Sequence, residues 1–324
     1  MLAILETGGE RVRINSSISW VDDLITEATA GDLFPDDPSA TGVVVNVESR
    51  KGAFDTDSWE PLTRGAWRFR DEVVVEDVCT TGFDLHVRCT PDDVEFTFRW
   101  RPQLRGRAAA QLLKTRFTLL AREVLLQYPA LWRASIRGRA PLHASVCTVG
   151  DMRPLLAGPG GVGKSTLMAK ELAAGGRAIS DNLCVSDGVT AWGVVEPMRV
   201  DRRVGRAVTY GRGEIPLPGR VKALAPSVLV VLRRGQDQVA RVRSCGTAAA
   251  VRSLVTGTYM AGELRRFWGL AATLTAGTGL GPPHPNVEPI ARQLASSLPA
   301  VEISLPRQPG VRLAELLTLA EAIA

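Results

Sequence analysis

The sequence has few cysteines, and they form no motif. Five are scattered over 324 residues without a Cys-x-x-Cys pair: Cys79, Cys89, Cys147, Cys184 and Cys245. An odd number at such spacings argues against a disulfide framework and against a zinc site. We therefore expect buried free thiols that pack as small apolar side chains.

Long hydrophobic segments are also missing. No run approaches the roughly 18 apolar residues that a membrane helix needs, and the apolar residues 2–5 are followed by Glu6 and Glu10. We therefore expect neither a membrane span nor a signal peptide, and a cytoplasmic protein with no membrane partner. The apolar fraction of 45% suffices for two domains, or for one large domain with an accessory piece.

Lysine is scarce, and the charges are unevenly distributed. Only five of the 39 basic residues are lysine, so a single arginine is weak evidence for bidentate recognition. Residues 1–100 carry 20 acidic and 9 basic residues, whereas residues 101–324 carry 14 and 30. No nucleic-acid-binding motif or aromatic stacking set accompanies the basic part. A nucleotide or an acidic partner surface therefore explains its charge as well as a nucleic acid does.

The hydrophobic pattern changes along the chain and predicts three regions. Residues 1–105 contain alternating segments typical of a half-exposed antiparallel sheet, which predicts a small acidic α+β domain for recognition. His86 lies in one of these segments and is expected to be structural or exposed. Residues 106–139 are predicted as a connecting helix, amphipathic from residue 106 to 128. Short apolar strands alternate with helices over residues 140–324, which indicates an α/β layered domain.

One segment of the third region forms a complete phosphate-binding motif. Residues 158–166 read Gly-Pro-Gly-Gly-Val-Gly-Lys-Ser-Thr, after a short apolar run and before a helix-forming stretch. Glycines let backbone N–H groups curl around phosphate oxygens, the lysine reaches the β- and γ-phosphates, and the serine hydroxyl binds Mg²⁺. The motif therefore predicts a nucleotide site formed by Gly158, Pro159, Gly160, Gly161, Val162, Gly163, Lys164, Ser165 and Thr166.

Two polar residues flank this motif at informative spacings. Asp181 lies 17 residues after Lys164, where a strand is expected to end, and His143 lies 21 residues before it. A carboxylate at the carboxyl end of a strand points into the crevice where nucleotides bind in α/β sheets. These two residues and Lys164 are the candidate catalytic groups. Each of the first two also has a purely structural interpretation, a turn cap for Asp181 and a hydrogen-bonded strand end for His143.

The residues around this motif resemble the HPr kinase/phosphorylase-like P-loop kinases, including related kinases found beside ribosomal-peptide biosynthesis genes. The resemblance covers roughly residues 140–200. It runs through Leu-His-Ala-Ser at 142–145, the glycine loop, Gly-Gly-Arg at 175–177 and Ile-Ser-Asp-Asn at 179–182. It implies an HPr-kinase-like P-loop domain that uses ATP and Mg²⁺. It also implies Asp181 as general base toward a serine hydroxyl, with His143 near the active site.

The chain departs from the family pattern at several positions. Asn182 replaces the second aspartate of the family's Asp-Asp pair, so the expected Mg²⁺ ligands become Ser165 and a neutral amide. Thr166 stands where bacterial HPr kinases commonly carry glutamate. Pro-Gly-Arg at 218–220 is similar to a family element, but its flanks differ. HPr itself is therefore not assigned as the substrate, and the family's hexameric assembly leaves a homo-oligomer open.

The leading hypothesis is an ATP-dependent phosphotransferase acting on a hydroxyl of a peptide, protein or small metabolite. Arginines of the glycine- and proline-rich segment 196–226 are candidates for binding the transferred phosphoryl group: Arg199, Arg202, Arg203 and Arg220. A nucleotide-dependent switch or scaffold for a partner protein is the alternative, favoured by Asn182. A third possibility is a biosynthetic enzyme that activates a carboxylate with ATP. A GTPase is disfavoured because no Asn-Lys-x-Asp motif occurs, and the apolar run 227–232 has no Walker B acid.

Overall fold

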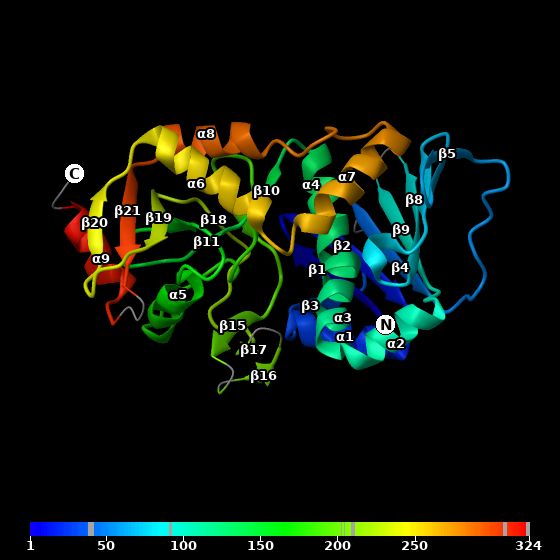
Figure 1. Cartoon of the computed structure of the whole chain (residues 1–324), viewed down its shortest axis with the longest axis horizontal. Coiled ribbons are helices and arrows are strands. Elements are labelled where there is room, and N and C mark those ends of the chain that lie inside the picture. Colours follow the sequence, from blue (N-terminus) through cyan, green and yellow to red (C-terminus); the bar gives the residue numbers. More distant parts are fainter. Residues whose placement is uncertain are drawn as a thin grey trace. The chain divides into compact units, whose positions relative to one another are not determined.

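The chain folds as a mixed α/β protein with two compact units (Figure 1). The computed structural model describes residues 1–37, 42–90, 93–201, 203, 205–208, 211–306 and 310–321. Unit 1 is built chiefly from Met1–Gly138 and Arg266–Pro285, and unit 2 from Arg139–Ala207, Gly211–Arg265 and Asn286–Ala324. The segment 106–139, interpreted from the sequence as a connector, thus belongs to unit 1 except for its last residue, Arg139. A second, C-terminal segment joins it there.

Unit 1 is organised around one mixed sheet. Its strand order is β3-β1-β2-β4-β9-β8-β7-β6-β5. The strands are β1 (Leu2–Thr7), β2 (Glu10–Ser16), β3 (Leu33–Pro35), β4 (Val43–Glu48), β5 (Glu60–Thr63), β6 (Ala66–Phe69), β7 (Glu72–Val75), β8 (Phe83–Cys89) and β9 (Val94–Trp100). Gly8 and Gly9 both have positive φ in the two-residue turn between β1 and β2, as a type I′ turn requires.

The predicted antiparallel pairing is confirmed for the alternating segments, since β8 pairs antiparallel with both β7 and β9, but it does not extend to the whole sheet. β4 pairs in parallel with both β2 and β9. A parallel pair needs a crossover rather than a hairpin, and α1 (Ser19–Thr29) lies in the connection between β2 and β4. The predicted half-exposure is confirmed, because buried and half-buried residues alternate along β4 and β9.

Helices cover one face of this sheet (Figure 1). The segment predicted as one amphipathic helix is broken into α2 (Leu104–Leu112), α3 (Lys114–Arg122), a π-helical turn at Glu123–Gln127 and α4 (Tyr128–Ile136). The Trp132 ring of α4 meets Phe96 of β9 edge-to-face at 5.9 Å. Tyr128 packs on Phe267 of α7 (Arg265–Thr278), with ring centroids 5.5 Å apart. Aromatic contacts therefore hold α4 and α7 in the core of unit 1.

Unit 2 contains a five-stranded sheet of order β11-β12-β19-β21-β20 among its described residues. These strands are β11 (Ala144–Val146), β12 (Pro154–Ala157), β19 (Val228–Arg234), β20 (Arg241–Ser244) and β21 (Ala300–Leu305). β12, β19 and β21 run parallel and are almost wholly buried, as expected for strands covered on both faces. Leu156, Leu232 and Ile303 share one core cluster with the helices α5 and α9.

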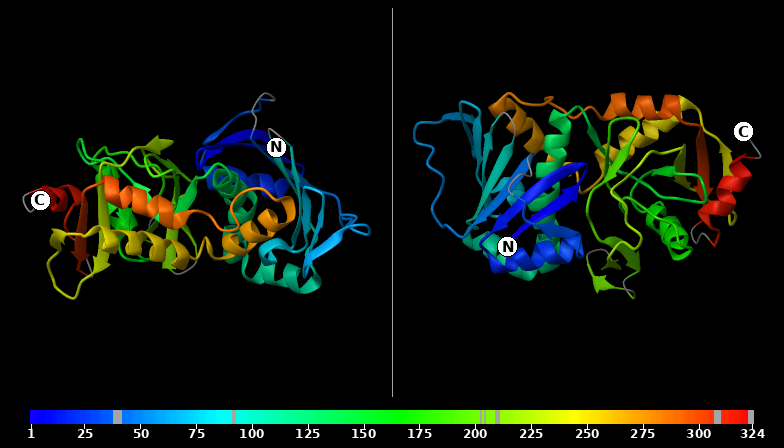
Figure 2. Two further views of the ribbon diagram at one scale, coloured as in Figure 1. Left: turned by 90° about the horizontal axis from the view of Figure 1, so that it is seen from above. Right: turned by 180° about the vertical axis from the view of Figure 1, so that it is seen from behind.

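Helices lie on both faces of this sheet. α5 (Lys164–Ala173) and α9 (Leu313–Glu321) pack on one face through that core cluster. Figure 2 shows α6 (Thr247–Met260) and α8 (Val287–Ser297) side by side, and α6 contacts β12 and β19. The three-layer arrangement agrees with the α/β pattern of the sequence.

Two smaller sheets complete unit 2. One has the order β10-β13-β14-β18, with β10 (Ala140–Leu142), β13 (Cys184–Ser186), β14 (Ala191–Gly193) and β18 (Ala223–Leu224). The other has the order β15-β17-β16, with β15 (Met198–Asp201), β16 (Arg206–Ala207) and β17 (Arg212–Ile215). The composition of the segment 196–226, rich in Gly, Pro and Arg and without periodicity, predicts a long loop or arm, but its described residues include these short strands. Only isolated bridges, not the expected strand, involve Ala178 ahead of Asp181.

The packing of α7 in unit 1 generates a stability prediction. A Cβ on Gly277 would collide with the Val73 side chain of β7 and lie 3.3 Å from Leu62. Gly277→Ala should therefore lower the free energy of unfolding by about 1–3 kcal/mol through overpacking. Gly269→Ala in the same helix adds a Cβ with nothing within 4 Å and should stabilise by up to about 1 kcal/mol. Urea unfolding of both variants checks this, and equal effects would contradict the packing.

Candidate functional site

The glycine-rich motif connects a buried strand to a helix in unit 2. β12 is fully buried and parallel to β19, and the loop of residues 158–163 leads directly into α5. Val162 anchors this loop in the core at 2% exposure, while Pro159, Gly160 and Gly161 are exposed. The loop therefore places its backbone groups at the N-terminus of a ten-residue helix, where N–H groups and the helix dipole favour an anion.

The glycines of the loop are required for different reasons. A Cβ on Gly158 would lie 2.7 Å from the Leu232 carbonyl oxygen, and one on Gly163 would lie 3.1 Å from Leu305 Cδ1. Gly161 has open space but a φ of +76°, which disfavours other residues. Gly160 has neither constraint. Steric need thus applies to two of the four glycines rather than to all.

Lys164 is buried and held by the loop itself. Its ammonium donates to the carbonyl oxygens of Gly158 (2.8 Å) and Pro159 (3.4 Å) and lies 3.4 Å from His143 Nε2. Burial lowers the pKa of Lys164 to about 8, partly opposed by Asp181, Glu263 and Glu196. The charged form of Lys164 is thus less favoured than it would be in water. A bound phosphate would favour this charged form and raise the pKa again.

Asp181 lies in the same buried cluster at 1% exposure. Its Oδ2 accepts the Arg199 backbone N–H at 3.0 Å, whereas Oδ1 is buried without a hydrogen-bond partner among the described residues. Burial raises the pKa of Asp181, and the Arg199 amide, the Ser165 hydroxyl and the Lys164 charge oppose that shift. An unpartnered buried carboxylate oxygen is costly, and a catalytic role or a bound water or ion is the usual explanation.

His143 lies between β10 and β11, at the point where the chain passes from one sheet to the other. Its backbone N–H is bound by Thr258 Oγ of α6 at 3.0 Å, which positions the ring. Burial, then the Lys164 charge, lowers the pKa of His143 to about 4. The imidazole is therefore neutral at physiological pH and is not charged when it faces Lys164.

Asn182 uses both ends of its side-chain amide within the protein. Its Oδ1 is 2.7 Å from His143 Nε2, and its Nδ2 donates to Glu263 Oε1 at 3.1 Å. Glu263, in the turn between α6 and α7, also pairs with Arg199 Nη1 at 2.5 Å. Because Asn182 Oδ1 is an acceptor, His143 Nε2 donates to it and cannot also accept from Lys164. Polar contacts thus run from His143 through Asn182 and Glu263 to Arg199 of β15, with Lys164 beside the histidine.

Three of the site's charged residues were not found from the sequence. Glu196 is buried and accepts the backbone N–H groups of Asn182 and Leu183 at 3.0 and 3.1 Å. Arg234, at the end of β19, donates to the Gly161 carbonyl at 3.0 Å and thereby supports the loop. Glu263 and Glu196 belong to no motif, so only the fold brings them to the loop. For Arg234 the sequence did offer a signal, because this residue ends a central parallel strand and ligands bind at the carboxyl ends of such strands.

The structure places the predicted arginines differently from one another. Arg199 lies beside Asp181 through its backbone, while its guanidinium turns to Glu263. Arg203 is exposed, next to β15. Arg220 lies beside Ala178 through a backbone bridge, three residues before Asp181. Arg202 lies outside the described residues.

The described residues include no cluster of three or more His, Cys, Asp or Glu side chains able to hold a metal. Magnesium needs few protein ligands, because it keeps several waters and binds substrate phosphates. Its preferred ligands are oxygens, and the Ser165 hydroxyl supplies one. The amide oxygen of Asn182, expected as a ligand, faces His143 instead.

The depressed pKa of His143 generates a prediction about stability and pH. Because the folded-state pKa (about 4) lies below the usual 6.5, the unfolded chain binds the proton first. Stability should be fully present above about pH 6.5 and fall as the pH drops toward 4. His143→Gln should remove on the order of 2 kcal/mol of this loss. Urea unfolding at pH 7 and 4.5 tests it, and parallel losses in both proteins would disprove it.

Comparisons with known proteins give little. No protein-family model matches the chain, and no curated protein matches it. Among solved structures, a match is found to the Hpr(Ser) kinase/phosphatase from Coxiella burnetii, at 15% identity over 32% of this chain and 77% of that chain. The TM-score of 0.23 carries no argument about function. No described helix is long and apolar enough to span a membrane.

Proposed function

We propose that unit 2 binds ATP with Mg²⁺ and transfers the γ-phosphate to a hydroxyl of a peptide, protein or small metabolite. The observation that most supports this proposal is the position of Asp181 beside a complete phosphate-binding loop. This carboxylate is 1% exposed, and its Oδ1 has no hydrogen-bond partner among the described residues. Phosphoryl transfer needs positioning, charge compensation and one carboxylate to orient the attacking hydroxyl. This cluster offers all three.

We assign Asp181 as the group that accepts the proton of the acceptor hydroxyl. Burial raises the pKa of this carboxylate, which makes it a stronger base than an exposed aspartate. The Arg199 backbone N–H fixes Oδ2, so Oδ1 is the oxygen oriented to accept a hydrogen bond from the hydroxyl. In this role Asp181 orients the nucleophile and takes its proton as the new P–O bond forms and the bond to the leaving nucleotide breaks.

The phosphates are assigned to the loop and Lys164. The ammonium now bound to the Gly158 and Pro159 carbonyls exchanges those neutral acceptors for phosphate oxygens, a stronger charge-assisted contact. When bound, Mg²⁺ neutralises charge on the β- and γ-phosphates. Ser165 is the residue assigned to hold it, which leaves Oδ1 of Asp181 for the acceptor hydroxyl. His143 stays neutral and is assigned a positioning role toward Lys164.

The alternative, a nucleotide-dependent switch, is supported by one specific observation. Polar contacts run from His143, beside Lys164, through Asn182 and Glu263 to Arg199, at the start of the small sheet β15-β17-β16. If phosphate draws Lys164 away from His143, the whole chain of contacts can rearrange. Hydrolysis without an acceptor would then serve to reset this sheet.

Substitution of the proposed base separates the two functions. Asp181→Asn keeps the size of the side chain and an acceptor for the Arg199 N–H but removes the basic oxygen. We expect ATP affinity to be retained and phosphoryl transfer to fall on the order of 10²- to 10⁴-fold. Transfer is measured with γ-labelled ATP, Mg²⁺ and an extract of the host as the source of acceptor.

Two further variants serve as controls for this experiment. Asp187→Asn changes a carboxylate that accepts the N–H groups of Val189 and Thr190 in a turn, so transfer should stay near normal. Lys164→Ala should abolish ATP binding. Near-normal transfer by Asp181→Asn would rule out the assigned base, and label appearing only as free phosphate would favour the switch.

The pKa of Lys164 predicts proton uptake on nucleotide binding. With a pKa of about 8, the free site is largely deprotonated near pH 9, whereas phosphate contacts should keep the bound lysine charged. ATP binding should therefore take up close to one proton at about pH 9 and almost none at about pH 7. Calorimetry in buffers of different ionisation enthalpy measures this uptake. Equal uptake at both pH values would show that the lysine does not contact the phosphates.

A further inference from the structure

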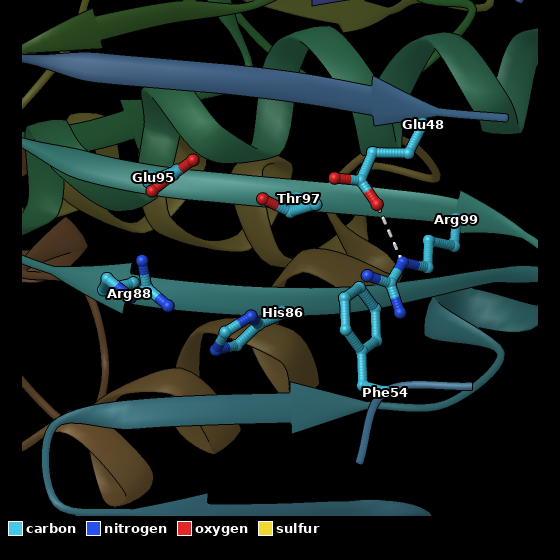
Figure 3. Close-up of a pocket in the computed structure, with 7 residues that line it drawn as sticks. All are labelled: Glu48, Phe54, His86, Arg88, Glu95, Thr97 and Arg99. Atoms are coloured by element: carbon cyan, nitrogen blue, oxygen red, sulfur yellow. Dashed lines mark hydrogen bonds and ion pairs between the residues drawn. The ribbon is translucent and has the colours of Figure 1, made fainter. Parts of the chain in front are cut away.

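Unit 1 contains a pocket that is built entirely from its own residues. The pocket is about 210 Å³ and lies on the face of the sheet to which the half-buried polar residues of β4 and β9 belong (Figure 3). Its floor comes from β4, β8 and β9, and Phe54 of the following segment stands at one side. The cavity combines charged side chains with an aromatic ring, and polar groups of this kind are what fix the orientation of a bound ligand.

One side of the pocket is structurally fixed. Arg99 pairs with Glu48 through Nε and Oε2 at 2.8 Å and donates to the carbonyls of Gly52 (3.4 Å) and Ala53 (3.1 Å). Its guanidinium also lies 4.0 Å from the centre of the Phe54 ring. Arg99 is 13% exposed, and these contacts use its charge within the protein. The Phe54 side of the pocket is therefore held in place rather than open to rearrangement.

The His86 side is fixed in a similar way. His86 Nε2 lies 2.6 Å from Glu72 Oε2, and its ring is 5.3 Å from Phe54 and 5.6 Å from Trp59. These rings offer an apolar surface for a side chain. The imidazole has a carboxylate partner already and is not needed by a ligand.

Three polar groups on the remaining side can still make hydrogen bonds or ion pairs with a ligand. Glu95 accepts one hydrogen bond from the Asn46 amide at 2.5 Å, and no cation within ion-pair distance of it is found in the described part of the chain. Arg88 is 53% exposed, and its Nε lies 3.4 Å from Glu72. Thr97 adds a hydroxyl that also lines the pocket. Arg88 and Glu95 are directly opposite in the β8–β9 register.

We propose that this pocket binds a small zwitterion of the α-amino-acid class. The ligand's ammonium group lies against Glu95 and the Thr97 hydroxyl, its carboxylate against Arg88, and its apolar side chain against Phe54 and His86. Arg88 and Glu95 are directly opposed, so they place a positive and a negative side chain next to each other. A zwitterion, whose carboxylate and ammonium lie a few ångströms apart, complements this pair. The volume of about 210 Å³ suits a ligand no larger than a single amino acid such as valine, leucine or methionine.

A direct ion pair between Arg88 and Glu95 is the competing arrangement, since opposite charges facing each other stabilise a sheet. No such pair forms among the described contacts, although the same sheet shows one at Glu60 and Arg68, which are also directly opposed, at 2.9 Å. The two pairs differ in that the first lines a pocket. Because every contact here belongs to unit 1, this inference is independent of the nucleotide site.

Calorimetric titration of the full chain without nucleotide tests the proposal. L-leucine and L-methionine should bind saturably with a Kd of about 1 mM or below. Blocking the ammonium as the N-acetyl derivative, or the carboxylate as the amide, should weaken binding by about tenfold each. Glu95→Gln should cost about tenfold, and Arg88→Gln about fivefold because this side chain is half exposed.

The Glu60–Arg68 pair supplies matched controls. Glu60→Gln and Arg68→Gln each remove the same charge from the same sheet outside the pocket, and both should bind as tightly as the parent. Thermal melts confirm that all four variants fold. Absence of saturable binding at about 10 mM, or equal losses in pocket and control variants, would overturn the proposal. Tighter binding of the N-acetyl or amide derivative than of the free amino acid would do so as well.

Discussion

The burial of charge around Lys164 is the constraint on which unit 2 depends. A lysine at 5% exposure loses its hydration, and the protein compensates with carbonyl oxygens of the loop and with the carboxylates of Asp181, Glu196 and Glu263. The same burial lowers the pKa of His143 and raises that of Asp181. Burial is therefore the main cause of the unusual protonation of both neighbours of the lysine. Lys164, Asp181 and the glycine loop are thus already assembled without a ligand.

This polar cluster also explains how the small sheet β15-β17-β16 is tied to the loop. Arg199 contributes its backbone to Asp181 and its guanidinium to Glu263, so one residue of β15 fixes both the proposed base and the carboxylate beyond Asn182. This ion pair is only partly buried, with side-chain exposures of 28% and 12%, and is weak evidence for stability. Unit 1 differs, because Arg88 and Glu95 remain partly solvated on an open sheet face and keep capacity for a ligand.

Several sequence expectations failed for identifiable reasons. The alternating segments β7, β8 and β9 are antiparallel as predicted, but alternation reports only which face is buried and not strand direction, so it gave no sign that β4 is parallel to both its neighbours. The helix predicted over residues 106–128 has the right periodicity but is divided at Leu113 and again at the π-helical turn of Glu123–Gln127. Residues 196–226 lack periodicity because their strands are very short, β16 and β18 having two residues each.

The sequence by itself determined the strand-loop-helix motif, since glycine, lysine and serine at fixed local spacing form one continuous turn of backbone. It also pointed to Asp181 and His143, although the strand expected before Asp181 is only a pair of isolated bridges. The tertiary structure alone decided that Glu196, Glu263 and Arg234 reach this loop, and that Asn182 faces His143. It likewise placed Arg88, Glu95 and Phe54 around one pocket. Local spacing cannot encode such contacts, because they depend on how distant segments pack and on which buried charges must find partners there.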